Sequence, residues 1–157
     1  MGSIHAVWER LPLPPEHAVP LSAGLVMRLW TGPARFPPAL RRTGELVVAA
    51  GLALNAFAVL ARGPGDVDRP SVLTRVGPYA FTRNPMFIGW SLVHLGTGLA
   101  ARSPMVLAAW PFSAALVHRA VLAEERDLAA TFGPDYSAYA ARVPRYGSLR
   151  RTAGSGR

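Results

Sequence analysis

Apolar residues run along the chain in blocks that are separated by short polar connections rich in proline and glycine. The clearest block is residues 43–61, which has one acid near its start and a single interior amide, Asn55. About twenty such residues form a helix that crosses a ~30 Å hydrocarbon core. The block therefore predicts a membrane helix. We expect Gly51 to allow close approach of a second helix and Asn55 to hydrogen-bond that neighbour.

Two further blocks, residues 85–101 and residues 104 to about 130, are separated only by a tight turn at residues 102–104. They predict a hairpin of two apolar helices. Pro111 lies inside the second helix and is expected to kink it, because proline has no N–H to bond to the preceding turn. A helical bundle tolerates such a defect when neighbouring groups satisfy the freed carbonyl.

The first apolar block, residues 18–30, has thirteen residues and contains Arg28, so it is too short to cross a bilayer unaided. Three alternatives stay open: a tilted, half-buried helix, an interfacial helix anchored by Trp30, or a first span lengthened by the residues before it. Proline and glycine predict an irregular lead-in over residues 1–17 and a loop over residues 31–42.

Together the blocks predict one all-α domain over residues 1–157, an integral-membrane helical bundle with three to four membrane helices and a cytosolic C-terminal helical tail. Within this domain we expect a variable lead-in at residues 1–42 and a flexible tail at residues 147–157.

Arginine counts predict the orientation. If the connection at residues 62–84 and the chain after Glu124 share one side of the membrane, that side carries ten arginines against four on the other. Positively charged residues collect in cytoplasmic loops. We therefore expect a plasma (inner) membrane protein whose residues 62–84 and C-terminal segment face the cytoplasm.

The amino-acid composition favours a membrane protein and excludes several kinds of catalytic residue. Half of the residues are apolar, mean hydropathy is +0.21 and only 17% are charged, below the roughly 25% of soluble domains. The net charge is +8, but the arginines lie between apolar blocks and not in one patch with aromatics, which favours an anionic membrane surface over nucleic acid. Without lysine or cysteine, Schiff-base and thiolate catalysis and cysteine metal sites are excluded, and no metal site is expected.

The segment at residues 77–89, GPYAFTRNPMFIG, places Arg83 and an amide beside aromatic residues where an apolar helix begins. We interpret it as one wall of a site at the membrane surface. The alternative is purely structural. On that reading Asn84 caps the helix, Pro85 opens it, Arg83 reaches lipid phosphate and the aromatics sit in the interfacial belt.

The segment at residues 124–146, EERDLAATFGPDYSAYAARVPRY, follows directly on the last apolar block. Acids at that depth are costly unless they are partnered, so Glu124 and Glu125 are functional candidates. The alternative is a solvated helix end with local ion pairs. His118 shares a helical face with Glu125, but we expect it to be a packed residue outside the site.

These two motifs, in this order and separated by a helical hairpin, resemble the isoprenylcysteine carboxyl methyltransferase and phospholipid N-methyltransferase superfamily of integral-membrane enzymes. The resemblance covers residues 46–146 and implies a methyltransferase that binds S-adenosylmethionine (SAM). Many prenylcysteine-type members have histidine where this chain has Asn84. The implied cofactor contacts are Gly77, Tyr79, Arg83, Asn84, Pro85, Phe87, Gly89 and Glu124 or Glu125, and Arg142 and Arg145 are implied to face the substrate as catalytic residues.

The second substrate is expected to be lipidic or membrane-partitioning. If its nucleophile is a carboxylate, Arg142 or Arg145 would orient it; if it is an amine, a base must remove a proton. The residues leave both possibilities open. Two other functions also stay open: an NADPH-dependent membrane reductase of the sterol type, and a non-catalytic membrane adaptor that keeps the fold.

Overall fold

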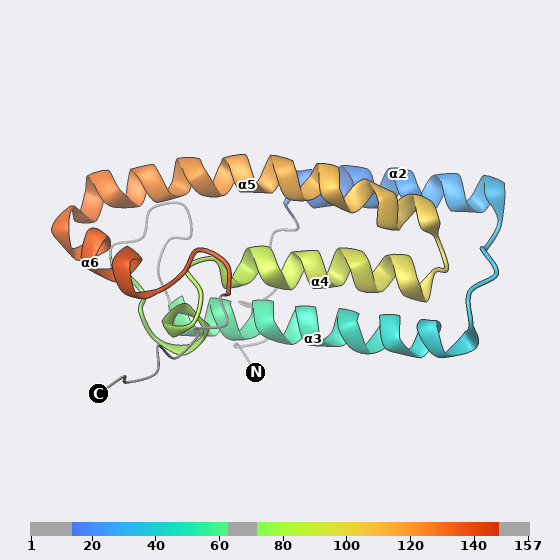
Figure 1. Cartoon of the computed structure of the whole chain (residues 1–157), viewed down its shortest axis with the longest axis horizontal. Helices are drawn as coiled ribbons and strands as arrows, with labels where there is room; N and C mark the ends of the chain where they lie inside the picture. Colours follow the sequence, from blue (N-terminus) through green and yellow to red (C-terminus); the bar gives the residue numbers. More distant parts are fainter. Residues whose placement is uncertain (1–13, 63–71, 148–157) are drawn as a thin grey trace, which may run out of the picture.

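A computed structural model describes residues 14–62 and 72–147 of the chain, and every regular element in these two ranges is helical. The four longer helices run roughly side by side, and the short elements gather at one end of the bundle (Figure 1). The all-α prediction is thus confirmed for these ranges. The elements are α2 (Pro15–Thr31), α3 (Pro38–Arg62), the 3-10 turn η1 (Gly77–Ala80), α4 (Pro85–Ala100), α5 (Pro104–Phe132) and α6 (Pro134–Arg142).

Each of the five α-helices begins at a proline. Proline suits the first helical position because its fixed φ is already helical and its missing N–H would have no partner there. Two predicted boundaries are wrong for this reason. The predicted loop at residues 31–42 shrinks to residues 32–37, and α3 has 25 residues. The predicted irregular lead-in ends earlier, because α2 begins at Pro15.

Parts of three other predicted segments lie outside the described residues. These are residues 1–13 of the predicted lead-in, residues 63–71 of the polar connection and residues 148–157 of the predicted tail. The helix α5 continues through Pro111 as one element, and in Figure 1 its first part slopes toward α4.

Glycines set the distance between α3 and α4, which pack antiparallel. A Cβ on Gly51 would lie 2.6 Å from the carbonyl oxygen of Gly89, and one on Gly44 would lie 2.6 Å from that of Gly96. Both distances are too short for any side chain, so the two backbones touch at points seven residues apart on each helix. The predicted role of Gly51 is confirmed.

Asn55 is fully buried over Gly89, where a Cβ would collide with its amide. Neither polar atom of its side chain has a hydrogen-bond partner among the described residues. The predicted hydrogen bond to a neighbouring helix is therefore wrong. The amide instead fills the space that the missing Gly89 side chain leaves.

Apolar side chains also cover the outside of the bundle. Leu29 and Trp30 on α2, Leu46 on α3 and Phe112 on α5 are between 62% and 87% exposed. Two helices, α3 and α5, are long and apolar enough to cross a membrane, and only 28% and 22% of their apolar windows are buried. A core helix of a soluble protein would be mostly covered, so these outer faces fit contact with lipid.

We predict that Gly51→Leu separates α3 from α4 and destabilises the protein by about 1–3 kcal/mol, since overpacking displaces backbone rather than a flexible side chain. The measurement is thermal unfolding in detergent. Ala50→Leu, one position away on an exposed face of α3, is the matched control and should leave the midpoint nearly unchanged. Equal shifts in both variants would contradict the close packing of α3 on α4.

Candidate functional site

The short elements lie at the end of the bundle where α4 begins, together with the end of α5 (Figure 1). Hydrogen bonds tie the connection before α4 to the chain after α6. The Thr82 hydroxyl donates to the Arg145 carbonyl oxygen at 2.8 Å, and the Arg83 N–H donates to the Pro144 carbonyl oxygen at 2.9 Å. Two segments that lie about sixty residues apart in sequence are thus joined at the backbone.

The Glu125 carboxylate is the centre of a buried polar cluster. Arg145 donates to both of its oxygens through Nε and Nη2 at 2.8–3.1 Å, and the Asn84 amide donates to Oε1 at 3.3 Å. The Arg83 guanidinium lies 3.5 Å from the same oxygen. Glu125 is only 9% exposed, and a buried carboxylate is stable only with such partners. The prediction that the two motifs converge is confirmed by these contacts.

The structural alternative required the side chain of Asn84 to cap α4. This side chain makes no capping hydrogen bond. Its amide nitrogen also donates to the Arg145 carbonyl oxygen at 3.3 Å, so the side chain reaches away from its own helix. Asn84 is the residue that links the start of α4 to both α5 and the C-terminal segment.

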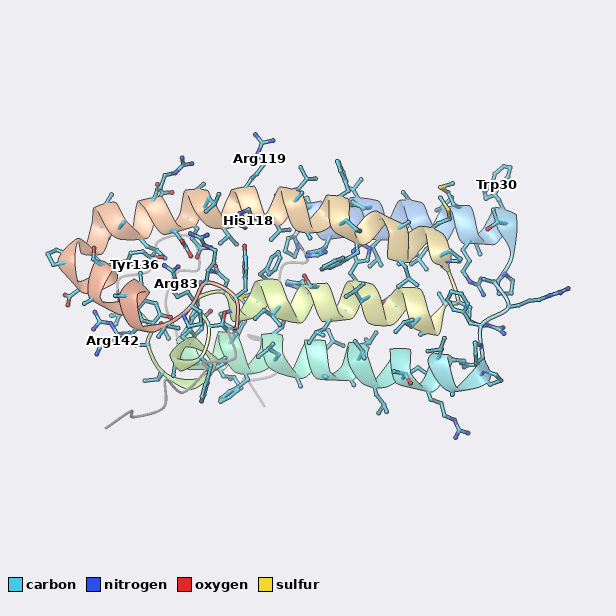
Figure 2. All side chains as sticks on the ribbon, in the orientation of Figure 1. Trp30, Arg83, His118, Arg119, Tyr136 and Arg142 are labelled. Atoms are coloured by element: carbon cyan, nitrogen blue, oxygen red, sulfur yellow. The ribbon has the colours of Figure 1, made fainter. Side chains whose placement is uncertain are left out.

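Tyrosines hold η1 against α6. The Tyr139 hydroxyl donates to the Tyr79 carbonyl oxygen at 2.7 Å. Burial raises the pKa of Tyr139 to about 12, so this hydroxyl keeps its proton at physiological pH. Arg83 donates to the Tyr136 hydroxyl at 3.3 Å, and Figure 2 shows these two side chains together beside α6.

A cavity of about 780 Å³ opens between α2, the start of α4 and the second half of α5. Its volume lies in the range of roughly 300–1,000 Å³ that is typical of small-molecule sites. Charged residues line part of it, and apolar residues from α4 and α5 line the rest. Its lining residues are Pro14, Glu16, His17, Arg62, Tyr79, Arg83, Asn84, Pro85, Met86, Phe87, Trp90, Val117, Ala120, Val121, Glu124, Asp127, Leu128 and Thr131.

Several polar atoms of these lining residues are buried and have no hydrogen-bond partner in the described part of the chain: Tyr79 Oη, Arg83 Nε, Trp90 Nε1 and His17 Nε2. Burial raises the pKa of Tyr79, so its hydroxyl stays a donor. An unpaired buried polar group costs about 1–3 kcal/mol. A ligand with matching donors and acceptors would remove that cost, so the cavity fits a polar small molecule.

Arg62 and Glu124 form an ion pair at 3.2 Å on the cavity wall, and the Arg62 guanidinium lies 5.4 Å from the centre of the Tyr79 ring. Glu16 and Asp127 add two further acids to the same wall. Within residues 14–62 and 72–147, no group of three or more histidine or acidic residues is arranged to hold a metal ion.

Residues 43–135 match the family model for phospholipid methyltransferase. This range covers more than half of the chain and includes η1, α4, α5 and nearly all of α3. The chain belongs to the phospholipid methyltransferase family. Comparison with curated proteins gave no match.

In this phospholipid methyltransferase family member, six of the residues implied as cofactor contacts line the cavity, and they come from both motifs. They are Tyr79, Arg83, Asn84, Pro85, Phe87 and Glu124. Their roles stay predictions. Glu125 does not line the large cavity. It lines a second pocket of about 30 Å³, which shares Arg83 and Glu124 with the first.

Other predicted site residues lie outside the large cavity. Gly77 has φ +60° and faces Ala61 at the start of η1, and Gly89 packs on α3. Arg142 is exposed on α6 and points away from the bundle in Figure 2, while Arg145 is engaged with Glu125. His118 contacts the Tyr146 hydroxyl at 2.7 Å and does not line the cavity.

Twelve of the eighteen lining residues were not predicted as contacts from the sequence, among them His17, Arg62 and Trp90. Trp90 directly follows the segment at residues 77–89, whereas Arg62 is the last residue of α3. His17 lies in the segment that was expected to be irregular. The apolar block at residues 18–30 indicated a helix there, and Pro15 was the signal that it begins before His17.

We predict that Tyr139→Phe lowers the stability of this family member by about 1–3 kcal/mol, because the variant leaves the buried Tyr79 carbonyl oxygen without its donor. Thermal unfolding in detergent is the measurement. Tyr79→Phe is the matched control: it removes a hydroxyl that has no partner in the described residues, so the midpoint should not fall. A larger loss for Tyr79→Phe would contradict the assigned contacts.

Proposed function

We propose that this protein is a SAM-dependent methyltransferase that acts in the membrane on a lipidic or membrane-partitioning substrate. One observation carries the proposal: the contact between Asn84 and Glu125 joins the two motifs beside a 780 Å³ cavity with unpaired polar atoms. Family membership supports methyl transfer. The cofactor supplies a methyl group on a sulfonium, and the protein supplies binding, orientation and shielding from water.

The lining residues offer partners for each part of SAM. Arg83 and the first N–H groups of α4, which have no intrahelical acceptor, would bind its carboxylate. Glu124 would accept hydrogen bonds from the ribose hydroxyls or the ammonium group, and Tyr79 or Phe87 would pack on the adenine. Methyl transfer is an in-line displacement, so alignment of the reacting atoms accounts for most of the catalysis that these residues would provide.

The acceptor would enter from the lipid. The cavity wall that α5 forms is apolar at Val117, Ala120 and Val121, and the outer faces of α2 and α5 also carry exposed apolar side chains. We place the cavity at the cytoplasmic side of the plasma membrane, in keeping with the arginines of the connection before α4 and of the C-terminal segment.

The direct test is equilibrium binding. We expect the purified protein in detergent to bind SAM at micromolar concentration by calorimetry, because the unpaired donors and acceptors of the cavity gain partners. NADPH, the ligand of a sterol-type reductase, should not bind in that range and serves as the control. Folded protein that gives no heat with SAM, or that binds NADPH instead, would overturn the proposal.

Glu125 is expected to matter for SAM although it lies behind the cavity wall. Glu125→Gln removes the charge that holds Arg83 and Arg145, so we predict that SAM binding weakens by about tenfold, or 1.4 kcal/mol, measured by calorimetry. His118→Ala, on the same helix but outside the cavity, should change binding by less than about twofold. The reverse order would show that the wrong face of α5 has been assigned.

The methyl acceptor can be found without a candidate in hand. Protein incubated with isotope-labelled SAM and a total lipid extract should produce a lipid that gains one labelled methyl group, identified by mass analysis. Arg83→Ala is the control that should abolish both binding and labelling. If that variant lost SAM binding and still carried out the protein's cellular role, a non-catalytic adaptor would be favoured.

A further inference from the structure

A pair of histidines lies at the α2 side of the cavity, away from the Glu125 cluster. His17 on α2 and His94 on α4 are each 1% exposed, and their Nδ1 atoms are 3.3 Å apart. His94 lies nine residues after Pro85, about 14 Å along α4 at 1.5 Å per residue. Of these two histidines, only His17 lines the cavity. Neither of the two motifs contains these residues.

The hydrogen bonds determine which nitrogen of each ring carries a proton. The His94 Nε2 lies 3.0 Å from the Val106 carbonyl oxygen, which can only accept, so Nε2 of His94 is the protonated nitrogen. No carboxylate in the described residues pairs with either ring, and burial favours the neutral forms. The His94 Nδ1 is then bare and accepts a hydrogen bond from the Nδ1–H of His17.

This chain leaves Nε2 of His17 as a bare acceptor. The atom is buried, and nothing in the described residues donates to it. Trp90, which lies one helical turn before His94 on α4, also lines the cavity and has an unpaired indole N–H. An acceptor and a donor without partners thus line the same cavity, which is what a bound group with both an N–H or O–H and a lone pair requires.

We propose that His17 is a catalytic residue that accepts the proton of the methyl-accepting group, and that His94 is the positioning residue that holds its ring in the required tautomer. This inference rests on the proposed methyl transfer. It assigns a role to α2, which lies before the family-matched segment, and it implies that the attacking atom of the substrate carries a hydrogen, as an amine or a hydroxyl does and a carboxylate does not.

The step balances in atoms and charge. The N–H or O–H bond of the acceptor breaks, and its proton forms a new bond to Nε2 of His17. A lone pair of the attacking atom would bond to the methyl carbon, the pair of the broken N–H or O–H bond would remain on that atom, and the pair of the sulfur–methyl bond would stay on sulfur. The positive charge therefore moves from the sulfonium to the imidazolium of His17. His94 still accepts from its Nδ1–H, and Glu16 and Asp127 line the same cavity as counter-charges.

The first test does not depend on activity. Nitrogen-15 NMR of the full-length protein with labelled histidine, in detergent, reads the protonation of each ring nitrogen. We expect Nδ1 of His17 to be protonated and Nε2 to be bare, with the reverse pattern on His94; the His17→Asn spectrum assigns the His17 signals. A protonated Nε2 on His17 would overturn the inference.

The second test uses two substitutions of His17 in the lipid-extract labelling assay. His17→Asn keeps an amide N–H that can donate to His94 but loses the cavity-facing acceptor. His17→Gln offers an oxygen that can accept a hydrogen bond but cannot take a proton. We expect both to lower kcat about 100-fold, the lower end of what a general base contributes, with the Kd for SAM unchanged by calorimetry. His118→Asn makes the same change outside the cavity and should retain the wild-type kcat.

The outcomes separate this inference from the function on which it rests. Wild-type protein that neither binds SAM nor labels a lipid would remove the proposed function, and the role of His17 with it. Wild-type protein that labels a lipid while His17→Asn matches its rate would overturn the role of His17 alone. A wild-type rate in His17→Gln, or a methyl ester as the labelled product, would do the same.

Discussion

The buried Glu125 carboxylate is the interaction on which the rest of the site depends. Removing a carboxylate from water costs several kcal/mol, and this cost is offset only where charged and amide donors surround it. Here the donors come from the connection before α4 and from the segment after α6, so satisfying one side chain of α5 brings three separate parts of the chain to one place. The position of Arg83 at the cavity wall follows from that cluster.

The bundle is tightly packed on one side of α4 and open on the other. Glycines bring the backbone of α4 against α3, and the buried Asn55 amide fills the space beside Gly89. On its opposite side, near its start, α4 faces α2 and α5 across the cavity, and larger residues such as Phe87 and Trp90 form the wall. The size of the residues along α4 therefore decides which side packs closely and which side borders the cavity.

Apolar patterning was enough to predict the hairpin, the long helix before it and the convergence of the two motifs, because burial and bilayer thickness constrain those features strongly. Local signals were less informative. Proline predicts a loop before α3, yet the same residue type begins each α-helix in the described ranges. The position of Asn84 before α4 is typical of a helix cap. Only the fold shows that its side-chain amide donates to Glu125 instead.

The residues of the site that belong to a continuous motif could be predicted from the sequence. The contacts between residues that are far apart in the sequence could not. The wall formed by Tyr79, Arg83 and Glu124 follows from the motif resemblance. The engagement of Arg145 by Glu125, and the approach of His17 to His94, depend on how helices are arranged in space. Neither sequence spacing nor residue type carries that information, so both pairings became visible only in three dimensions.

The position of α2 has a consequence for how such a protein can diversify. It lies upstream of the segment that defines the family, yet it completes the cavity with Pro14, Glu16 and His17. Most of the pocket lining thus comes from the family-matched segment, and residues at the start of α2 complete it. A change in α2 can therefore alter the shape and polarity of the cavity without any change in the family-matched segment.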